Sequence, residues 1–572
     1  TGIVHCAPSH GPDDFNLCLS NGIKAVETVD GDGKYTDNVL LFEGLHIFKA
    51  NPIVIEKLKD QKKLLKNGEL VHSYPHSWRS KAPLVHRATP QWFISMESHK
   101  LREKALKAID ETNFYPNKGK ERLRSMIETR PDWCVSRQRV WGVPLPIFIH
   151  KKTKEILIDS EVFDNIAKIY EQEGSDCWFS DNPQRFLGKK FKSEDFEKLS
   201  DIVEVWFDSG STHSFVLEKR KDLRWPASMY LEGSDQHRGW FHSSLLESCG
   251  TRGRAPFESI LSHGFVVDGK GLKMSKSLGN VIAPEDILKK YGADILRIWV
   301  ASSNYAEDLR IDYSILDQHS ESYRKIRNTF RYLLGNLKDN FDEINLQNVK
   351  PEELPELEQL MLHKIYSLDR KFKKYFQSYD FHNLYKELLN FCTVDLSAFY
   401  FDIRKDVLYC DPEASEKRKS TLILLDIILN SLLRWFAPIL AFTTEEIYQL
   451  VSKRNKSIHL EQFIEFPKEF ENNELSNKWN EILKIREICN LSIEEKRASK
   501  EIGSSLEADL EIKLNHKLLK LTKEIDFAEL CITSKFLVKE KNDEEVIVKT
   551  IKAKGNKCPI CWKISEDACE RH

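Results

Sequence analysis

The chain has 572 residues, too many for one hydrophobic core, and at roughly 150 residues per domain its length predicts about four domains. Hydrophobic residues make up 41% and charged residues 30% of it, which excludes disordered, collagen-like and low-complexity proteins. The formal net charge of −2 gives no global sign of nucleic-acid binding, so any basic surface must be local. No apolar run reaches the ~18 residues of a membrane span, and the best candidate, 421–442, is broken by Asp426, Arg434 and Pro438. The 12 cysteines, mostly isolated, predict a reducing cytoplasmic location.

The first 200 residues read as mixed structure. Short apolar runs occupy 1–8 and 71–74, with a turn signal at 30–33. Apolar residues at helical spacing predict helices over 98–110 and 118–129. Short strand-like runs follow, among them 145–150 and 155–158.

Between 200 and 300 one pattern occurs three times: a short apolar run and then a polar, glycine-containing loop. The runs are 202–206, 228–231 and 260–266, and helix-like stretches lie at 240–247 and 284–291. This alternation predicts a parallel α/β sheet, in which ligands bind beyond the carboxyl ends of the strands.

From about 305 to 465 the pattern is almost purely helical and predicts a bundle. Thr443–Glu446 has the form of a capping box and predicts a helix start. Polar segments at 346–355 and 467–474 are candidate linkers, and strand-like pieces at 510–514 and 545–551 precede a cysteine cluster at the end of the chain.

The sharpest local signal is the run Lys273-Met274-Ser275-Lys276-Ser277, which follows a predicted strand. Ammonium groups, hydroxyls and loop amides together can hold a polyphosphate, whereas a lone lysine pair would be an ordinary solvated turn. These five residues match, letter for letter, the lysine loop of the class I aminoacyl-tRNA synthetases. The resemblance assigns them to ATP binding and gives Lys273 and Lys276 a catalytic role.

A second signal is the run 231–241, Leu-Glu-Gly-Ser-Asp-Gln-His-Arg-Gly-Trp-Phe. Taken alone it is a strand-to-helix loop whose carboxylate could meet a ribose or an amine. With 201–212 and 130–146 it resembles the isoleucyl-tRNA synthetases over essentially the whole chain. The resemblance implies ATP-dependent activation of isoleucine to an adenylate and transfer to tRNA(Ile), with Mg²⁺ accompanying ATP. Glu232 would contact the adenylate, and Asp235 and Gln236 would lie beside the amino-acid pocket.

The start of the chain, 5–14, holds two histidines and two aspartates, a pattern that also suits a polar loop. In the family this stretch belongs to the editing domain, which hydrolyses valine from mischarged tRNA. By position, Asp14 would bind the substrate's ammonium group and His5 would line the same pocket. One missing methylene gives only ~10–200-fold discrimination, for which isoleucyl-tRNA synthetase is itself the standard illustration, so a second sieve is needed.

The end of the chain carries Cys558, Cys561, Cys569 and His572 as two closely spaced pairs. Such pairs are the usual layout of a structural zinc site, although a single Cys-x-x-Cys is equally compatible with incidental cysteines. The family often ends in a zinc ribbon of two Cys-x-x-Cys pairs. Here the gap between the pairs is short and the last ligand would be a histidine, so Cys558 and Cys561 are the firmer assignments.

The class I enzymes also need a His-x-Gly-His element near the N-terminus, and none occurs in this sequence. We therefore expect a C-terminal portion of the enzyme that is inactive in adenylation by itself. The expected fold is multidomain α/β: a partial Rossmann-like catalytic core, a partial β-rich editing domain, a helical anticodon-binding bundle and a small zinc-binding region. The expected domains are 1–75 (editing), 76–305 (catalytic), 306–466 (bundle), 467–555 (junction) and 556–572 (zinc tail).

We expect a cytoplasmic monomer with isoleucine, ATP and tRNA(Ile) as partners and no membrane contact. Three alternatives remain. A valine-specific sister enzyme is disfavoured by residues 232–241. A non-catalytic tRNA-binding module would need only the bundle and the zinc tail. A free-standing deacylase would need an editing domain that looks cut at Thr1.

Overall fold

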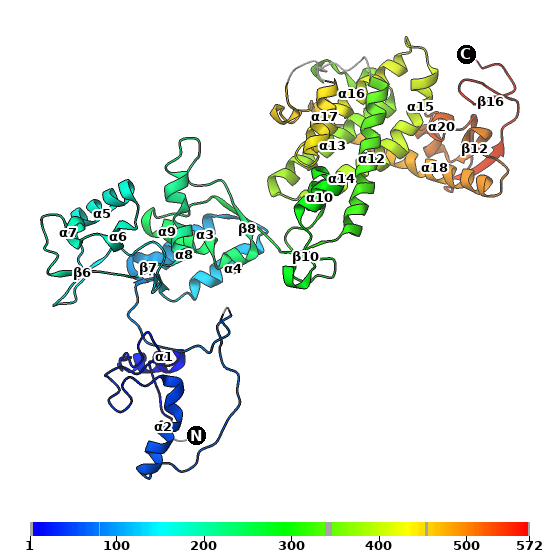
Figure 1. The fold of residues 1–572 in the computed structure, drawn as a ribbon. Helices are drawn as coiled ribbons and strands as arrows, with labels where there is room; N and C mark the ends of the chain where they lie inside the picture. Colours follow the sequence, from blue (N-terminus) through cyan, green and yellow to red (C-terminus); the bar gives the residue numbers. More distant parts are fainter. Residues whose placement is uncertain (1–3, 79, 338–345, 452–455, 570–572) are drawn as a thin grey trace. The chain divides into compact units, whose positions relative to one another are not determined.

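The computed structural model describes residues 4–78, 80–337, 346–451 and 456–569. The chain divides into two compact units, and each is described by itself (Figure 1). The first comprises 1–112, 122–228 and 237–258, and the second comprises 113–121, 229–236 and 259–572. A boundary falls inside helix α4 (Lys118–Glu128), which lies where the sequence predicts a helix.

The N-terminal part of the first unit contains two helices, α1 (Pro12–Ser20) and α2 (Ile47–Asp60). Its strand-like pairings up to residue 75 are isolated bridges, Val29 with Tyr35 and Lys34 with His46. The structure therefore differs here from the β-rich region that we expect from the sequence. The apolar runs at 4–8 and 71–74 form no strand, because a strand needs a hydrogen-bonded neighbour and neither run has one among the described residues.

The rest of the first unit is built from short antiparallel strand pairs and helices. Helix α9 (Trp240–Thr251) is buried along most of its length and packs against α3 (Leu101–Glu111) and α8 (Val205–Gly210). A smaller cluster around the buried Trp178 holds a separate core. Its helices are α5 (Ser160–Glu173), α6 (Cys177–Ser180) and α7 (Pro183–Leu187). The strand pairs are β1 (Phe93–Ile94) with β3 (Trp133–Cys134), β4 (Ser136–Arg137) with β7 (Ile202–Val203), and β5 (Phe148–His150) with β6 (Phe196–Lys198).

One of the three runs predicted for the parallel sheet does not belong to it. In the run 202–206 only Ile202 and Val203 are extended, and they pair antiparallel with β4. The chain then turns into α8 at Val205. The prediction for this run was wrong because an apolar stretch of five residues does not by itself distinguish a strand from the first turn of a helix.

The other two runs form the parallel sheet of the second unit. Strand β9 (Ser259–His263) lies between β2 (Asn113–Tyr115) and β8 (Tyr230–Gly233), and all three run parallel. The chain continues from β9 into β10 (Val266–Asp268), which pairs parallel with β11 (Leu309–Ile311). At the carboxyl edge Glu232 lies opposite Ser262, and Gly233 lies opposite His263. The polar loop 232–234 singled out in the sequence begins at this edge, and the loop 268–271 follows β10.

Helices follow the sheet, and those from residue 313 onward form the predicted bundle, coloured green to yellow in Figure 1. The first is α10 (Pro284–Tyr291), which has the predicted bounds. The others are α11 (Ala293–Ser302), α12 (Tyr313–Leu337), α13 (Glu356–Ser378), α14 (Phe381–Asn390), the π-helix η7 (Phe391–Tyr400), α15 (Phe401–Cys410), α16 (Glu416–Phe436) and α17 (Ala441–Val451). Helix α17 begins at Ala441, so the capping-box prediction placed its start too late. None of the helices described is both long and apolar enough to cross a membrane.

The C-terminal part opens with a long helix that the sequence reading missed, α18 (Asn473–Ala498). Strand β12 (Ala508–Leu514) then pairs parallel with β13 (Lys535–Glu540) and antiparallel with β14 (Ile547–Lys552). Helices α19 (His516–Leu521) and α20 (Phe527–Leu530) connect them, and β15 (Asn556–Lys557) pairs with β16 (Ile564–Ser565) in a final ribbon. Buried side chains of the bundle and of this sheet belong to one continuous hydrophobic core.

Candidate active site

The loop after β10 is held in shape by two polar side chains, Asp268 and Asn280. One oxygen of Asp268 accepts hydrogen bonds from the backbone amides of Lys270 (3.0 Å) and Leu272 (2.8 Å), and the other accepts from Asn280 Nδ2 (2.9 Å). Asn280 Oδ1 in turn accepts from the amide of Ser275 (2.9 Å). These hydrogen bonds, the one from Asn280 first, hold the pKa of Asp268 below its ordinary value. The sequence reading gave neither residue a role, although an aspartate before a glycine is a turn signal.

The five-residue lysine motif lies on this frame. Met274 is half-buried and packs against the hydrophobic core, which fixes the middle of the motif. Ser275 Oγ lies 3.1 Å from Ser277 Oγ and caps the short turn that begins at Lys276. Lys273 and Lys276 are exposed, and among the described residues no carboxylate lies within ion-pair distance of either ammonium group. The loop therefore presents two uncompensated positive charges on a backbone that Asp268 and Asn280 hold in place.

Glu232 lies at the carboxyl end of β8 in the same unit, and its side chain is exposed. The next residue is closely surrounded, because a Cβ at Gly233 would lie 2.6 Å from Asp235 Oδ1 and 3.8 Å from the imidazole of His263. Asp235 is exposed, and its Oδ2 accepts a hydrogen bond from Gln236 Nε2 (3.0 Å). The structure thus places Glu232 at the sheet edge and joins Asp235 to Gln236 just beyond it.

A buried group of carboxyls in the first unit was not found from the sequence. Glu204 accepts hydrogen bonds from Trp133 Nε1 (2.9 Å) and Arg137 Nη2 (3.3 Å). Glu247 on α9 is buried, and its Oε1 has no hydrogen-bond partner among the described residues. Burial, and then the carboxylates of Asp208 and Glu204, raise the pKa of Glu247 to about 9. Its only sequence signal is a glutamate within the otherwise weakly polar stretch 241–249.

Helices α8 and α9 meet at this neutral carboxyl. A Cβ at Gly210 would overlap Glu247 Oε1 and would lie 2.9 Å from Ser243 Oγ, so a larger residue there would displace the buried Glu247 carboxyl. Trp240 Nε1 also donates a hydrogen bond to the carbonyl of Ser209 (3.0 Å), which ties the end of α8 to the start of α9. The segment 205–210 is therefore positioned by a close helix contact.

The two residues predicted for editing lie apart from the nearby cavity. Asp14 is half-buried on α1 and its Oδ2 accepts a hydrogen bond from the amide of Ala7 (2.8 Å), while His5 is exposed. A cavity of about 660 Å³ is lined mostly by residues within 8–15 and 86–91, and neither His5 nor Asp14 is among them. Arg87 lines it and donates hydrogen bonds to the carbonyl of Val29 and to Glu27, both at 3.2 Å.

Three of the four predicted metal ligands come together in the C-terminal ribbon. Ligand atoms of Cys558, Cys561 and Cys569 all lie within 4.8 Å of one another, and Cys561 Sγ is 3.8 Å from Cys569 Sγ. Two thiolates that share a tetrahedral zinc at ~2.3 Å each are expected to be about 3.8 Å apart, so the donor set fits zinc. His572 lies outside the described residues.

Residues 22–312 match the family described as tRNA synthetases class I (I, L, M and V), and residues 358–513 match the anticodon-binding domain of tRNA ligase. The chain belongs to the class I tRNA synthetases. The predicted catalytic and anticodon-binding parts are therefore confirmed as family regions. The first match runs across the boundary predicted between the editing and catalytic domains and does not separate them.

Three curated proteins that resemble this chain all belong to one branch of this family. The isoleucine–tRNA ligase of Pelagibacter ubique (strain HTCC1062) is 77% identical over 572 residues, covering 100% of this chain and 63% of that protein. The isoleucine–tRNA ligase of Gluconobacter oxydans (strain 621H) is 45% identical, covering 100% of this chain and 60% of its own length. The isoleucine–tRNA ligase of Syntrophotalea carbinolica is 46% identical, covering 98% of this chain and 62% of its own length. A solved Mycobacterium tuberculosis methionyl-tRNA synthetase in complex with methionyl-adenylate matches 68% of each chain with a TM-score of 0.48 at 16% identity.

The chain thus spans 60–63% of the length of the first two relatives. The resemblance to isoleucyl-tRNA synthetases that the motifs indicate is confirmed by this similarity. The valine-specific alternative gains no support from these relatives, which all carry the isoleucine name.

Proposed function

We propose that the chain supplies the second half of the adenylation site, the anticodon-binding bundle and the C-terminal region of an isoleucine–tRNA ligase. In this reaction isoleucine and ATP give isoleucyl-adenylate and pyrophosphate, and the isoleucyl group then passes to the terminal ribose of tRNA(Ile). The observation that carries the proposal is the lysine loop, where Lys273 and Lys276 have no carboxylate partner among the described residues. The relatives that cover the whole chain bear this activity in their names.

The role of the loop follows from where charge develops. When the isoleucine carboxylate attacks the α-phosphorus of ATP, negative charge grows on the departing pyrophosphate. An ammonium group fixed in advance stabilises that charge without reorganisation at the moment of reaction. Asp268 and Asn280 hold the backbone of the loop, so phosphate binding orders the side chains of Lys276 and Lys273 but costs little backbone entropy. Ser275 and Ser277 supply hydroxyl donors, Met274 anchors the loop, and Mg²⁺ bound with ATP would share the phosphate charge.

The remaining residues of the sheet edge bind the other end of the substrate. Glu232 is exposed at the end of β8 and offers a carboxylate to the adenylate. Asp235 and Gln236 lie in the short 3₁₀ turn Ser234–His237 that follows β8 directly, and they would border the amino-acid pocket. Gly233 lets the backbone of this segment pass close to the Asp235 carboxylate.

The outer parts of the chain complete the proposal. Residues 1–75 would belong to an editing domain that hydrolyses valyl-tRNA(Ile), with Asp14 and His5 in its pocket. Residues 76–305 form the catalytic part, 306–466 the bundle, 467–555 the junction and 556–572 a zinc tail. There Cys558, Cys561, Cys569 and His572 would bind structural Zn²⁺. The enzyme would act as a cytoplasmic monomer.

The test replaces the aligned region of the Pelagibacter ubique enzyme with this chain, because the two are 77% identical over all 572 residues. In that chimaera, Lys276→Ala is expected to lower the rate of isoleucine-dependent ATP–pyrophosphate exchange about 10²–10³-fold, the usual loss for one transition-state donor. The affinity for tRNA(Ile) should stay within about twofold.

Lys270→Ala is the matched control, since Lys270 is an exposed lysine of the same loop that lies outside the motif. It should leave the exchange rate unchanged. A chimaera without exchange activity, or a Lys276→Ala variant that loses tRNA affinity but exchanges pyrophosphate at the normal rate, would contradict the catalytic role and favour a tRNA-binding module.

A further inference from the structure

The strand beside the lysine loop carries an exposed arginine, Arg310, which lies outside the five-residue motif. Its neighbours in β11, Leu309 and Ile311, are buried. The backbone carbonyl of Arg310 accepts a hydrogen bond from Trp299 Nε1 (3.0 Å), and parallel pairing with β10 holds the strand along its edge. The backbone that carries this guanidinium is therefore fixed by the core and by the neighbouring strand.

The strand register places Arg310 on the same face as the first lysine of the motif. Val267 of β10 lies opposite Arg310 in the parallel ladder and opposite Lys273 in an antiparallel bridge. Residues directly opposite one another on neighbouring strands present their side chains to the same face of a sheet. Arg310 and Lys273 therefore flank Val267 on one face, and both are exposed.

The guanidinium of Arg310 lies against the backbone of the lysine loop itself. A Cβ at Gly271 would lie 3.5 Å from Arg310 Nη2, 3.6 Å from Nε and 3.7 Å from Cζ. Because these three distances are nearly equal, the plane of the guanidinium faces Gly271. Its N–H donors lie in that plane and remain accessible at its edge. The contact orients the guanidinium and leaves its donors available to a ligand.

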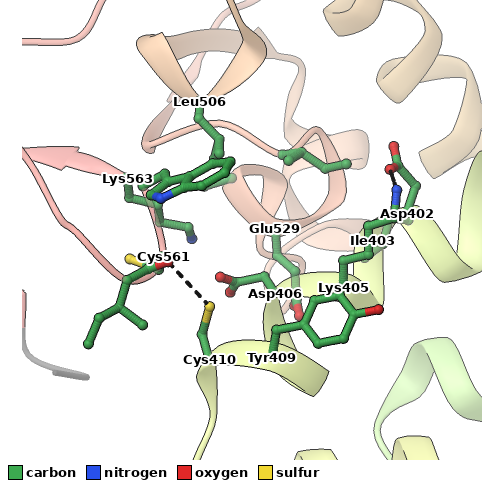
Figure 2. Close-up of a pocket in the computed structure, with 14 residues that line it drawn as sticks. Asp402, Ile403, Lys405, Asp406, Tyr409, Cys410, Leu506, Glu529, Cys561 and Lys563 are labelled. Atoms are coloured by element: carbon green, nitrogen blue, oxygen red, sulfur yellow. Dashed lines mark hydrogen bonds and ion pairs between the residues drawn. The ribbon is translucent and has the colours of Figure 1, made fainter. Parts of the chain in front are cut away.

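Arg310 has no acidic partner. Many cations of the second unit pair with a carboxylate, as Lys405 does with Asp402 at 2.8 Å (Figure 2). Among the described residues no carboxylate lies within ion-pair distance of Arg310, Lys273 or Lys276. The loop and the strand beside it thus hold three unpaired cations.

The aspartates at the ends of β10 and β11 serve as structural acceptors instead. Asp268 accepts hydrogen bonds from the loop, as described above. Asp308 accepts from the amide of Phe265 (2.8 Å), and Asp312 accepts from the amide of Ile315 (2.8 Å). These carboxylates order the backbone and form no ion pair with the three cations.

We propose that Arg310 is a third phosphate-binding cation of the adenylation site and holds the β- and γ-phosphates of ATP together with Lys273 and Lys276. A guanidinium binds a phosphate through two parallel N–H···O hydrogen bonds, whereas an ammonium group acts as a point charge. A polyphosphate has several charged groups in a row and can therefore meet several fixed cations at once. The inference rests on the proposed function, which makes ATP the source of the phosphates.

Arg310 contributes to binding more than to the chemical step. Its backbone belongs to the sheet, so the guanidinium meets the phosphates in the same way before and during the attack on the α-phosphorus. An interaction of equal strength in the ground state and the transition state lowers KM and leaves kcat unchanged. This separates Arg310 from Lys276, whose loss is expected to lower the rate itself.

The first test measures ATP–pyrophosphate exchange in the Pelagibacter ubique chimaera. Arg310→Gln is expected to raise the KM for ATP about 10- to 150-fold, the usual loss for one charged hydrogen-bonded contact. The kcat and the KM for isoleucine should stay within about threefold. Arg310→Lys keeps the charge but loses the paired donors, so it should raise the KM for ATP about 3- to 10-fold. Lys405→Gln removes one exposed cation of helix α15 and is the control, which should exchange like the wild type.

The second test uses the complete 572-residue chain without nucleotide. Isothermal titration with inorganic tripolyphosphate measures the anion site directly. Arg310→Gln should weaken tripolyphosphate binding by about the factor seen in the KM for ATP, and Lys405→Gln should leave it unchanged. Because Arg310 is exposed, neither substitution at this position should change Tm.

The outcomes distinguish this inference from the proposed function. If exchange proceeds in the wild-type chimaera and Arg310→Gln changes neither the KM for ATP nor tripolyphosphate binding, the phosphate role of Arg310 is wrong and the proposed function stands. A variant with a raised KM for tRNA(Ile) in aminoacylation but normal exchange would show that Arg310 binds the RNA backbone, which also overturns the assignment to ATP. A fall in kcat together with Tm would show a structural role. If the wild-type chimaera exchanges no pyrophosphate, the proposed function fails, and the tripolyphosphate titration alone decides whether Arg310 binds phosphate.

Discussion

The neutral carboxyl between α8 and α9 predicts an unusual dependence of stability on pH. Glu247 has a pKa of about 9, against its ordinary value of 4.5, because burial and the neighbouring carboxylates of Asp208 and Glu204 oppose its ionisation. Between these two pH values the folded protein binds a proton at Glu247 that the unfolded chain has lost. The stability of the first unit must therefore fall as pH rises through this window. Replacing Glu247 with glutamine, a neutral side chain of the same shape, removes the proton and with it the dependence.

The size of the effect follows from the same two values. Each pH unit inside the window costs about 1.36 kcal/mol, so the three units from pH 5 to pH 8 amount to about 4 kcal/mol. At pH 5 the two proteins should differ little, since pH 5 lies only half a unit above the unfolded pKa of 4.5 and little of the pH-dependent free energy has yet been lost. At pH 8 the Glu247→Gln variant should be more stable than the wild type by about that amount.

Hydrogen–deuterium exchange of peptides from α8 and α9 measures this local stability, after correction for the intrinsic rates at each pH. Glu171→Gln, at an exposed glutamate of α5, is the control and should show no pH-dependent difference from the wild type. If the protection difference between Glu247→Gln and the wild type is the same at pH 5 and pH 8, the carboxyl is ionised in the folded protein and the reasoning fails.

Two further substitutions test the packing of the second unit. Arg404 is 2% exposed, and its guanidinium pairs with the fully buried Glu358 at 2.6 Å. Arg404→Ala should therefore reduce the free energy of unfolding by about 3–5 kcal/mol in urea titrations, because it leaves the Glu358 carboxylate buried without its partner. Changing both Glu358 and Arg404 to methionine should cost far less, and an equal loss in the double variant would contradict this reasoning. At Gly264 a Cβ would overlap the backbone carbonyl of Glu307. Gly264→Ala should therefore reduce the free energy of unfolding by about 1–3 kcal/mol, measured as a lower Tm. An unchanged Tm would show that the backbone at Glu307 moves aside readily.

The sequence predicted those elements whose signals are local. Helix α10 has its predicted bounds because Pro284 supplies the first residue, Gly292 ends the helix, and acidic and basic residues lie in the first and last turns. The lysine loop was found because a motif of five residues is legible without knowledge of its surroundings. The cysteine ribbon was found through spacing, and three of its four proposed ligands converge.

Elements that depend on distant partners were missed. Helix α17 begins at Ala441 because its first turn is fixed from outside, by Asp294, which accepts hydrogen bonds from the amides of Phe442 (3.3 Å) and Thr443 (2.8 Å). The capping-box pattern, which starts two residues later, could not predict this contact because Asp294 is about 150 residues away in the sequence. Glu247 was missed for the same reason, since its environment is made by residues some 40 positions earlier.

Some glycines in the catalytic region are explained by the local backbone conformation and others by side chains that pack against them. Gly271 and Gly279 have φ of 83° and 65°, so the lysine loop needs them for its backbone path. Gly233, Gly210 and Gly269 differ in kind, because a Cβ at each would displace a carboxylate oxygen of Asp235, Glu247 or Asp312, respectively. Both kinds look identical in the sequence. In the second kind a carboxyl group approaches the backbone. Glu247 and Asp312 come from distant parts of the chain, whereas Asp235 is two residues from Gly233. A glycine adjacent to a charged motif is therefore a position at which another group can pack against the backbone. In these three cases that group is a carboxyl group.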